Sequence, residues 1–332
     1  MLADVEASVS SPLLVGRSGQ VSALAAALAQ AARGHPSAVM VGGEAGVGKS
    51  RLVNEVAQRA RGTGARVLTG GCLELGADSL PFAPFTSVLR ELVRDLGAAR
   101  VAELLPGGSA RELARLLPEF GEPAGPDDPG EARARLFEQM LLLLEHLAGD
   151  GPVVLVIEDM HWADRSSRDL LAFLIRNQPT LDGVLIVMTY RSDELHRSHP
   201  LRLLLAELGR TGWVTRMDLG RLTRQDTGQL VAHIIGRMPG EDLLDAVYRR
   251  TEGNPLFVEA LLNDGELGAE MPESLHDLLV AGVRRLPEES QELVRVASAG
   301  GERTGHGLLA AVTGLDDVTL DRALRPAVAT NC

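Results

Sequence analysis

A glycine-rich stretch near the start of the chain has the residue types and spacing of a phosphate-binding loop. Residues 37–50 read SAVMVGGEAGVGKS, so Lys49 and Ser50 directly follow the glycines. Loop glycines let backbone N–H groups turn towards phosphate oxygens, and a helix that begins behind them adds the positive end of its dipole. The glycines of this turn are Gly43, Gly46 and Gly48. We expect Lys49 to reach the β and γ phosphates of a nucleotide and the Ser50 hydroxyl to hold Mg²⁺.

The alternative interpretation of this pattern is an ordinary glycine loop between a strand and a helix. A chance match to the pattern is expected in roughly one of a thousand chains of this composition. Lys49 is the only lysine among 33 basic residues. It stands where a compact ammonium group suits the chemistry better than a planar guanidinium. The neighbouring Val47 and Arg51 are included among the expected nucleotide-binding residues.

Two carboxylates follow an uninterrupted apolar run. The run VVLVI at 153–157 is typical of a strand buried on both faces of a parallel sheet, and it ends on Glu158 and Asp159. Ligands of α/β sheets bind at the carboxyl ends of the strands. Beside a phosphate-binding loop, Glu158 would hold Mg²⁺ through water and Asp159 would polarise the attacking water. A buried strand that ends in acids by chance is the alternative.

An arginine ends another apolar run. Residues 184–189 read VLIVMT and are followed by Tyr190 and Arg191. At this position Arg191 could reach a γ-phosphate and report its presence. By contrast, we expect His161 and Trp162 to pack the turn after residue 159 against the sheet, with Asp164 or Ser166 as the N-cap of the next helix.

Strand and helix patterns alternate up to residue 220. Apolar runs at 39–41, 66–69, 153–157, 184–189 and 215–219 are separated by helical patterns, including one at 109–117. This alternation predicts an α/β fold in which helices cover both faces of a parallel sheet. Beyond residue 220 the pattern is helical, at 223–237, 240–251, 255–267 and onward.

Composition restricts the class of protein. The 332-residue chain has 45% hydrophobic residues and a net charge of −12, which argues against a broad nucleic-acid-binding surface. Its cysteines, Cys72 and Cys332, are too few and too far apart for a disulfide framework or a zinc site, and Cys72 is expected to be a small buried residue rather than a nucleophile. Neither a signal peptide nor a membrane-spanning run is evident, so we expect a cytoplasmic protein.

The sequence alone does not assign a function to two further motifs. Val15, Gly16 and Arg17 precede the first helical pattern, where a turn with a solvated arginine is the simpler interpretation. Gly253, Asn254 and Pro255 precede a later helical pattern, where Pro255 suits the first position of a helix and need have no other role.

Taken together and in this order, the motifs resemble the nucleotide-binding module of STAND ATPases, a class of AAA+ ATPases. They are most similar to the module of large ATP-binding transcription regulators of the LuxR family, and related modules accompany class III adenylyl cyclases. The motifs that carry the resemblance are Gly-Arg before the first helix, the glycine-rich loop, Glu-Asp followed by His-Trp-Ala-Asp, Tyr-Arg, and Glu-Gly-Asn-Pro-Leu-Phe-Val-Glu.

The resemblance implies a P-loop NTPase domain at 13–220 behind a leader at 1–12, a helical subdomain at 221–270 and a partial winged-helix subdomain at 271–332. It implies ATP or ADP with Mg²⁺ as cofactors, bound by Ser50 and Glu158 at the metal. Val15, Gly16 and Arg17 would border the adenine and ribose, and Pro255 would lie against the adenine.

The resemblance further implies a switch. In such a switch an ADP-bound state is off and an ATP-bound state self-associates, with Arg191 as the γ-phosphate sensor. Glu158 stands where the general P-loop pattern has Asp, and the short Asp159 is consistent with slow hydrolysis. The family's sensor repeats and DNA-binding helix-turn-helix are not in this sequence, so the chain resembles a fragment, and contact with DNA would come from regions outside it.

Two other functions remain open. One is an ATPase that works alone or serves a signalling enzyme such as an adenylyl cyclase, which predicts multiple turnovers per minute. The other is a non-catalytic interaction module in which nucleotide is structural. Direct DNA binding by 271–332 is a minor possibility, because Arg284, Arg285 and Arg295 are interleaved with acids.

Overall fold

The computed structural model describes residues 13–74, 80–105, 110–123, 128–263, 283, 286–299, 306–317, 319–320 and 322–324. Its contacts divide the chain into two units. The sheet unit comprises Gly16–Glu44 and Gly48–Gly220, and the helical unit comprises Met1–Val15, Ala45–Val47 and Arg221–Cys332. The leader expected at 1–12 lies outside the described residues, as does much of 271–332. The domain boundaries expected from the sequence stay predictions.

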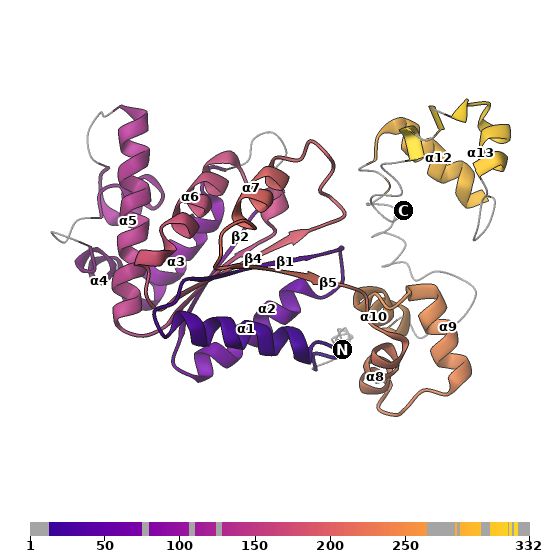
Figure 1. Cartoon of the computed structure of the whole chain (residues 1–332), viewed down its shortest axis with the longest axis horizontal. Coiled ribbons are helices and arrows are strands. Elements are labelled where there is room, and N and C mark those ends of the chain that lie inside the picture. Colours follow the sequence, from indigo (N-terminus) through magenta and orange to yellow (C-terminus); the bar gives the residue numbers. More distant parts are fainter. Residues whose placement is uncertain are drawn as a thin grey trace, which may run out of the picture. The chain divides into compact units, whose positions relative to one another are not determined.

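Five parallel strands form the sheet, in the spatial order β2-β3-β4-β1-β5 (Figure 1). Their bounds are β1 Ser37–Gly43, β2 Arg66–Gly71, β3 Val153–Glu158, β4 Val184–Arg191 and β5 Val214–Leu219. Every residue of β1 is buried, as are nearly all of β3 and β4, whereas the edge strand β5 is largely exposed. The apolar runs of the sequence therefore become central strands, because such strands bury side chains on both faces.

Helices cover both faces of the sheet, which gives three layers (Figure 1). One face carries α1 Ser18–Ala31 and α2 Lys49–Gly62. The helices and 3₁₀ turns of the rest of the sheet unit are α3 Ala83–Leu96, α4 Ala98–Glu103, η3 Leu113–Arg115, η4 Pro118–Phe120, α5 Pro129–Gly149, η5 Met160–Trp162, α6 Arg165–Arg176, η6 Gln178–Thr180 and α7 Pro200–Leu208. Helices α3, α5, α6 and α7 lie on the opposite side of the sheet from α1 and α2.

The strand register brings the candidate site residues to one edge of the sheet. Gly43 at the end of β1 pairs with Arg191 at the end of β4, and Glu158 at the end of β3 pairs with Gly71. Because all strands are parallel, their carboxyl ends share this edge. The α/β parallel architecture predicted from the sequence is confirmed.

The helix predicted at 109–117 is wrong. The described part of this segment contains only the 3₁₀ turn η3. Leu117 has extended backbone angles and precedes Pro118, and a proline disfavours helical angles in the residue before it. Glu112 is buried and accepts hydrogen bonds from Arg115 and Arg135, so ion pairs with two segments hold the turn.

The helical unit begins with three helices around a small apolar core. These are α8 Arg224–Ile235, α9 Glu241–Thr251 and α10 Pro255–Asn263. Their core consists of Val15, Leu222, Leu230, Val231, Val247, Val258 and Leu261. Farther along are α12 Glu288–Ala299 and α13 His306–Thr313, where Leu293, Leu309, Leu320 and Ala323 form a separate cluster.

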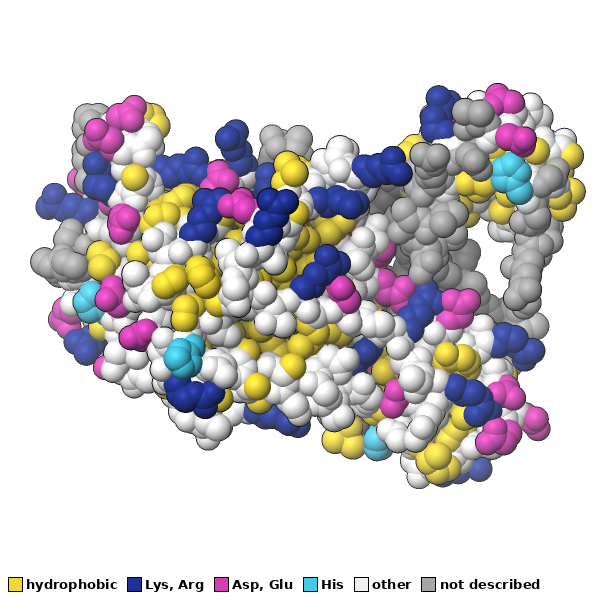
Figure 2. Space-filling view, in the orientation of Figure 1, with side chains coloured by type: hydrophobic (Ala, Val, Ile, Leu, Met, Phe, Trp, Pro, Cys, Tyr) yellow, Lys and Arg dark blue, Asp and Glu magenta, His cyan; other side chains and the backbone are white. Residues whose placement is uncertain are grey.

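The charges agree with a mixed rather than a basic surface. Arg284 and Arg285 lie outside the described residues, whereas Arg295 forms an ion pair with Glu292 on α12. On the face shown in Figure 2, arginine and acidic side chains both occur across the described residues. Over those same residues, no helix is long and apolar enough to cross a membrane.

The turn before α10 has room only for glycine. Gly253 has a φ of +79°, and a Cβ added there would lie 2.1 Å from the carbonyl oxygen of Leu222. The backbone of Leu222 is held beside Gly253, because the Leu222 N–H donates to the Gly253 carbonyl at 2.8 Å. An L side chain at this position would therefore combine backbone strain with a clash against the backbone.

We expect Gly253→Ala to destabilise the helical unit by about 2 kcal/mol or more, as strain and overlap together predict. Hydrogen exchange of the α8 and α10 amides would measure the effect as lost protection. Gly240→Ala is the matched control, since Gly240 has a φ of −67° and a Cβ added there would meet open space. Equal protection in the two variants would contradict the prediction.

Candidate nucleotide-binding site

The loop between β1 and α2 has the backbone of an anion-binding turn. Gly46 and Gly48 have φ angles of +75° and +99°, in a region that side chains rarely adopt. Gly48 is also the N-cap residue of α2, and no side chain caps that helix end. A helix N-terminus of this kind can bind an anion through its first N–H groups and its dipole.

Lys49 lies at the base of this loop and is turned onto it. Its buried Nζ donates to the carbonyls of Gly43 at 2.8 Å and Glu44 at 2.7 Å. The pKa of Lys49 is lowered to about 8, mainly by burial and also by the charge of Arg191. The acids Asp193, Asp159 and Glu194 oppose this shift of the pKa. Negative phosphate oxygens at this place would stabilise the ammonium form in the same way as these acids do.

Glu158 lies next to the serine of the loop. Burial raises the pKa of Glu158, and a hydrogen bond from Ser50 opposes the rise. The oxygen Oε1 of Glu158 is buried and has no hydrogen-bond partner among the described residues. A carboxylate and a hydroxyl are the hard oxygen ligands that Mg²⁺ prefers. The pair therefore fits Mg²⁺, and Ser50 and Glu158 are the residues that would hold it.

The protein offers few ligands at this point. Among the described residues, no group of three or more His, Cys, Asp or Glu side chains could hold a metal ion. Sites for Mg²⁺ commonly use one or two protein carboxylates and take other ligands from water and substrate phosphates. Metal binding at Glu158 would thus depend on a phosphate ligand.

Asp159 has an unusual backbone that the neighbouring strand supports. Its φ is +56°, a left-handed conformation that aspartate tolerates better than most residues. Its N–H donates to Oγ1 of Thr189, which is fully buried on β4, at 3.0 Å. The backbone turn after β3 is therefore tied to β4, the strand that ends in Arg191.

Arg191 is held by three neighbouring side chains. Its Nη1 donates to Oε1 of Glu194 at 2.6 Å. Its guanidinium carbon lies 4.8 Å from the centre of the Trp162 ring, and its backbone N–H donates to Nδ1 of the buried His161 at 3.3 Å. The sequence predicted only packing for His161 and Trp162, and in the structure both also contact Arg191.

Sequence reasoning missed Asp193 and Glu194. Both follow Arg191 in the segment after β4, and both influence the charge on Lys49. The signal that could have found them is their spacing, because residues two and three places after an arginine in a turn can fold back on it. Two acids one residue beyond a strand end are such a signal.

Within the helical unit, the tip of the glycine-rich loop is held by Asn254, a further residue that sequence reasoning missed. Nδ2 of the buried Asn254 donates to the Ala45 carbonyl at 3.0 Å. The Leu256 N–H donates to Oδ1 of Asn254 at 3.1 Å and to the Gly46 carbonyl at 3.3 Å. A Cβ on Gly46 would lie 2.8 Å from Asn254 Oδ1, so glycine is needed for this close approach as well as for the turn.

The residues expected at the adenine have different environments in the structure. Val15 is buried in the core of the helical unit, and Pro255 is the first residue of α10, as predicted. In the sheet unit, Gly16 has a φ of +69°, and Nη2 of the buried Arg17 donates to the Gly220 carbonyl at 2.6 Å. Arg17 is thus a structural link after β5 rather than a solvated cation.

The last two expected nucleotide-binding residues differ in burial. Val47 is fully buried and Arg51 is half-buried. The roles of Val47, Arg51 and the residues expected at the adenine stay predictions.

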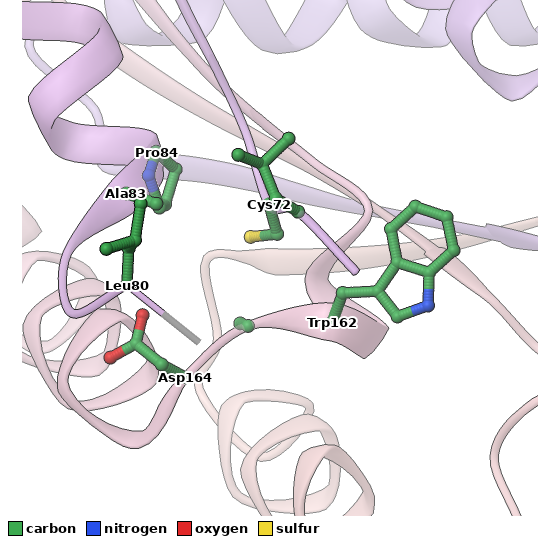
Figure 3. A pocket seen from close by; sticks show the side chains of 8 residues that line it. Cys72, Leu80, Ala83, Pro84, Trp162 and Asp164 are labelled. Atoms are coloured by element: carbon green, nitrogen blue, oxygen red, sulfur yellow. The ribbon is translucent and has the colours of Figure 1, made fainter. Parts of the chain in front are cut away.

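A small pocket lies at the end of β2, beside the turn after β3. It encloses about 190 Å³, counting space open to solvent, and Cys72, Pro84, Trp162 and Asp164 are among its lining residues (Figure 3). Cys72 is buried, and burial, followed by the charges of Asp164 and Asp159, raises its pKa to about 12. The prediction that Cys72 is a buried residue is confirmed. Asp164 is the N-cap of α6, since it accepts from the Ser167 N–H at 3.0 Å.

The fold and the loop define a P-loop NTPase of the α/β class. The AAA ATPase domain family matches residues 13–187, more than half of the chain, and the chain belongs to this family. The fold is similar to that of the Walker-type ATPase paby2304 of Pyrococcus abyssi, at 15% identity and a TM-score of 0.60, over 99% of this chain and 93% of that one. The family implies nucleotide binding.

Two further similarities cover longer proteins. A STAND protein with a tetratricopeptide repeat sensor, PH0952 from Pyrococcus horikoshii, is 16% identical with a TM-score of 0.45, over 98% of this chain and 41% of that one. "Uncharacterized protein R02095" of Rhizobium meliloti (strain 1021) is 31% identical over 245 residues, which are 69% of this chain and 22% of that protein. The chain thus spans about a fifth of the length of this curated relative.

The raised pKa of Cys72 predicts a thiol that resists alkylation. In a Cys332→Ser background at pH 8, a pKa near 12 instead of 9 leaves about a thousandfold less thiolate. We expect iodoacetamide to label the native protein more slowly than the guanidinium-unfolded protein by about that factor, as followed by mass spectrometry. Similar labelling rates in the two states would show that Cys72 is neither buried nor shifted.

Proposed function

We propose that this AAA ATPase module is the ATP-binding, slowly hydrolysing switch of a STAND-type transcription regulator similar to the large ATP-binding LuxR-family proteins. The observation that carries the proposal is the convergence of Lys49, Glu158, Asp159 and Arg191 at the carboxyl edge of one parallel sheet. A phosphate-binding loop, a metal carboxylate, a water-activating acid and a γ-phosphate sensor are the parts that nucleotide-dependent phosphoryl transfer needs.

Each residue has a role in this proposal. Lys49 would exchange its two loop carbonyls for the β and γ phosphates, and Ser50 and Glu158 would hold Mg²⁺. When bound, Mg²⁺ supplies positive charge that offsets the phosphate oxygens. Asp159 would orient a water and accept its proton.

Arg191 would bind the γ-phosphate. ADP lacks that group, so Arg191 gives the protein a means to bind the two nucleotides with different affinity. A ligand shifts a conformational equilibrium only by its differential affinity for the two states. We assign the ADP-bound form to the off state and the ATP-bound form to a self-associating on state, in a cytoplasmic protein whose DNA contacts belong to regions outside this chain.

The alternatives predict different turnover. A stand-alone ATPase, or the ATPase module of a signalling enzyme, would complete several turnovers per minute, whereas the switch would hydrolyse slowly and copurify with ADP. Identifying the nucleotide released when the purified protein is denatured separates them at low cost.

We expect Lys49→Ala to weaken binding of Mg²⁺–ATP and Mg²⁺–ADP by about a hundredfold or more, because the only ammonium group in the site is removed. Isothermal titration calorimetry would measure this. Arg59→Ala is the matched control: Arg59 is on the same helix, exposed, and paired with Glu55. A Lys49→Ala protein that binds ATP like the wild type would overturn the site assignment.

We expect Asp159→Asn to slow hydrolysis by about a hundredfold and to leave the affinity for ATP within a few-fold, because Asn keeps the shape and tolerates the left-handed backbone but is a poor base. Single-turnover phosphate release would give the rate. Asp169→Asn is the control, because Asp169 is an acid on α6 that is paired with Arg133 on α5. Unchanged hydrolysis in Asp159→Asn would favour the non-catalytic interaction module.

A further inference from the structure

The side chain of Glu194 is bound to Arg191, the residue proposed above as the γ-phosphate sensor. Its Oε1 accepts from Arg191 Nη1 at 2.6 Å, and its Oε2 lies 3.5 Å from Nε2 of His161. The side chains of Arg191 and Glu194 are each 24% exposed, so water screens their attraction only in part. The carboxylate is therefore held on the sensor arginine by two neighbours at once.

Trp162 fixes the other side of the same guanidinium. The ring lies 4.8 Å from the Arg191 guanidinium carbon and packs against His161, with 4.5 Å between ring centres. A cation over an aromatic face is stabilised by the ring quadrupole. Together, Trp162 and Glu194 hold Arg191 in one defined position, which we call the parked position.

The parked position is close to the phosphate-binding loop. Arg191 pairs with Gly43 in the strand register, and both Arg191 and Glu194 affect the charge on Lys49. A terminal phosphate that engaged Nη1 of Arg191 would compete with the Glu194 carboxylate, because both are anions that bind a guanidinium through charge-assisted hydrogen bonds. A nucleoside diphosphate has no γ-phosphate and would not compete with Glu194 for Arg191.

We propose that Glu194 is a specificity-determining positioning residue that competes with the terminal phosphate of a nucleoside triphosphate for Arg191. This role rests on the proposed function of the site. Glu194 lowers the affinity for the triphosphate relative to the diphosphate, and so sets how strongly triphosphate binding can shift the protein between its two states. Trp162 is the reporter of the exchange, because it loses the guanidinium when Arg191 leaves the parked position.

The test compares affinities for Mg²⁺–ATP and Mg²⁺–ADP by calorimetry. Glu194→Gln keeps the size of the side chain and removes its charge. It is expected to tighten ATP binding about two- to fivefold more than ADP binding, the range of a partly exposed ion pair. In an Arg191→Ala background the same substitution is expected to leave the ratio of the two affinities unchanged.

Asp193→Asn is the control for general charge. The charge of Asp193 has a larger effect on the pKa of Lys49 than that of Glu194. Neutralising Asp193 is therefore expected to change the affinities for ATP and ADP by a similar factor. A Glu194→Gln protein whose two affinities also change equally would overturn the proposal, since Glu194 would then act only through the total charge. Thermal unfolding of each variant confirms that it is folded.

Fluorescence gives a second readout that a merely structural role would not produce. The chain has two tryptophans, and Trp213→Phe leaves Trp162 as the only indole. ATP, but not ADP, is expected to change the emission of Trp162, and Glu194→Gln is expected to lower the ATP concentration at the midpoint. Identical changes with both nucleotides would overturn the proposal. Failure of the wild type to bind either nucleotide would instead refute the proposed function, and this role with it.

Discussion

The parallel register of β1, β3 and β4 is the constraint on which the site depends. These strands are buried almost completely, and their charged residues, Glu158 and Arg191, occur where the strands end. Pairing of Gly43 with Arg191 places the start of the glycine-rich loop beside the arginine, and the hydrogen bond from Asp159 to Thr189 ties the acidic turn to the same strand. One buried sheet thereby positions groups that are far apart in the sequence.

The two cations at this edge of the sheet, Lys49 and Arg191, are both bound by oxygens of the protein itself. Lys49 donates to two carbonyls of its loop, and Arg191 donates to Glu194. All three hydrogen bonds use protein oxygens at places where the proposed function puts phosphate oxygens. Nucleotide binding would therefore be an exchange of partners rather than the occupation of empty donors, and the net gain is smaller than the new bonds alone suggest. Such an exchange is well suited to a switch, because small differences between ligands then decide which state is favoured.

Within the helical unit, the side-chain amide of Asn254 makes the main polar contacts with the tip of the glycine-rich loop. Asn254 is buried and uses both ends of its amide, one on the Ala45 carbonyl and one on the Leu256 N–H. A buried amide that satisfies its polar atoms in this way fixes the backbone it bonds. The turn around Gly253 is restricted by the Leu222 carbonyl, so the motif that the sequence singled out for Pro255 is also a rigid connection to the loop tip.

Local sequence patterns are enough to predict most of the strands and the residues at their ends. Glycine spacing defines the loop, uninterrupted apolar runs define the buried strands, and Glu158, Asp159 and Arg191 could be placed at strand ends because parallel sheets put them there. Which side chains contact one another across the fold could not be predicted in this way. The contacts of Trp162 with Arg191, and of Asn254 with Ala45, join segments whose spacing in the chain carries no periodic signal. The segment 109–117 shows the same limit, since the ion pairs of the buried Glu112 and the following proline outweighed a helical pattern. Local patterns report on burial and backbone preference, whereas pairings between distant polar groups depend on the packed arrangement that brings them together.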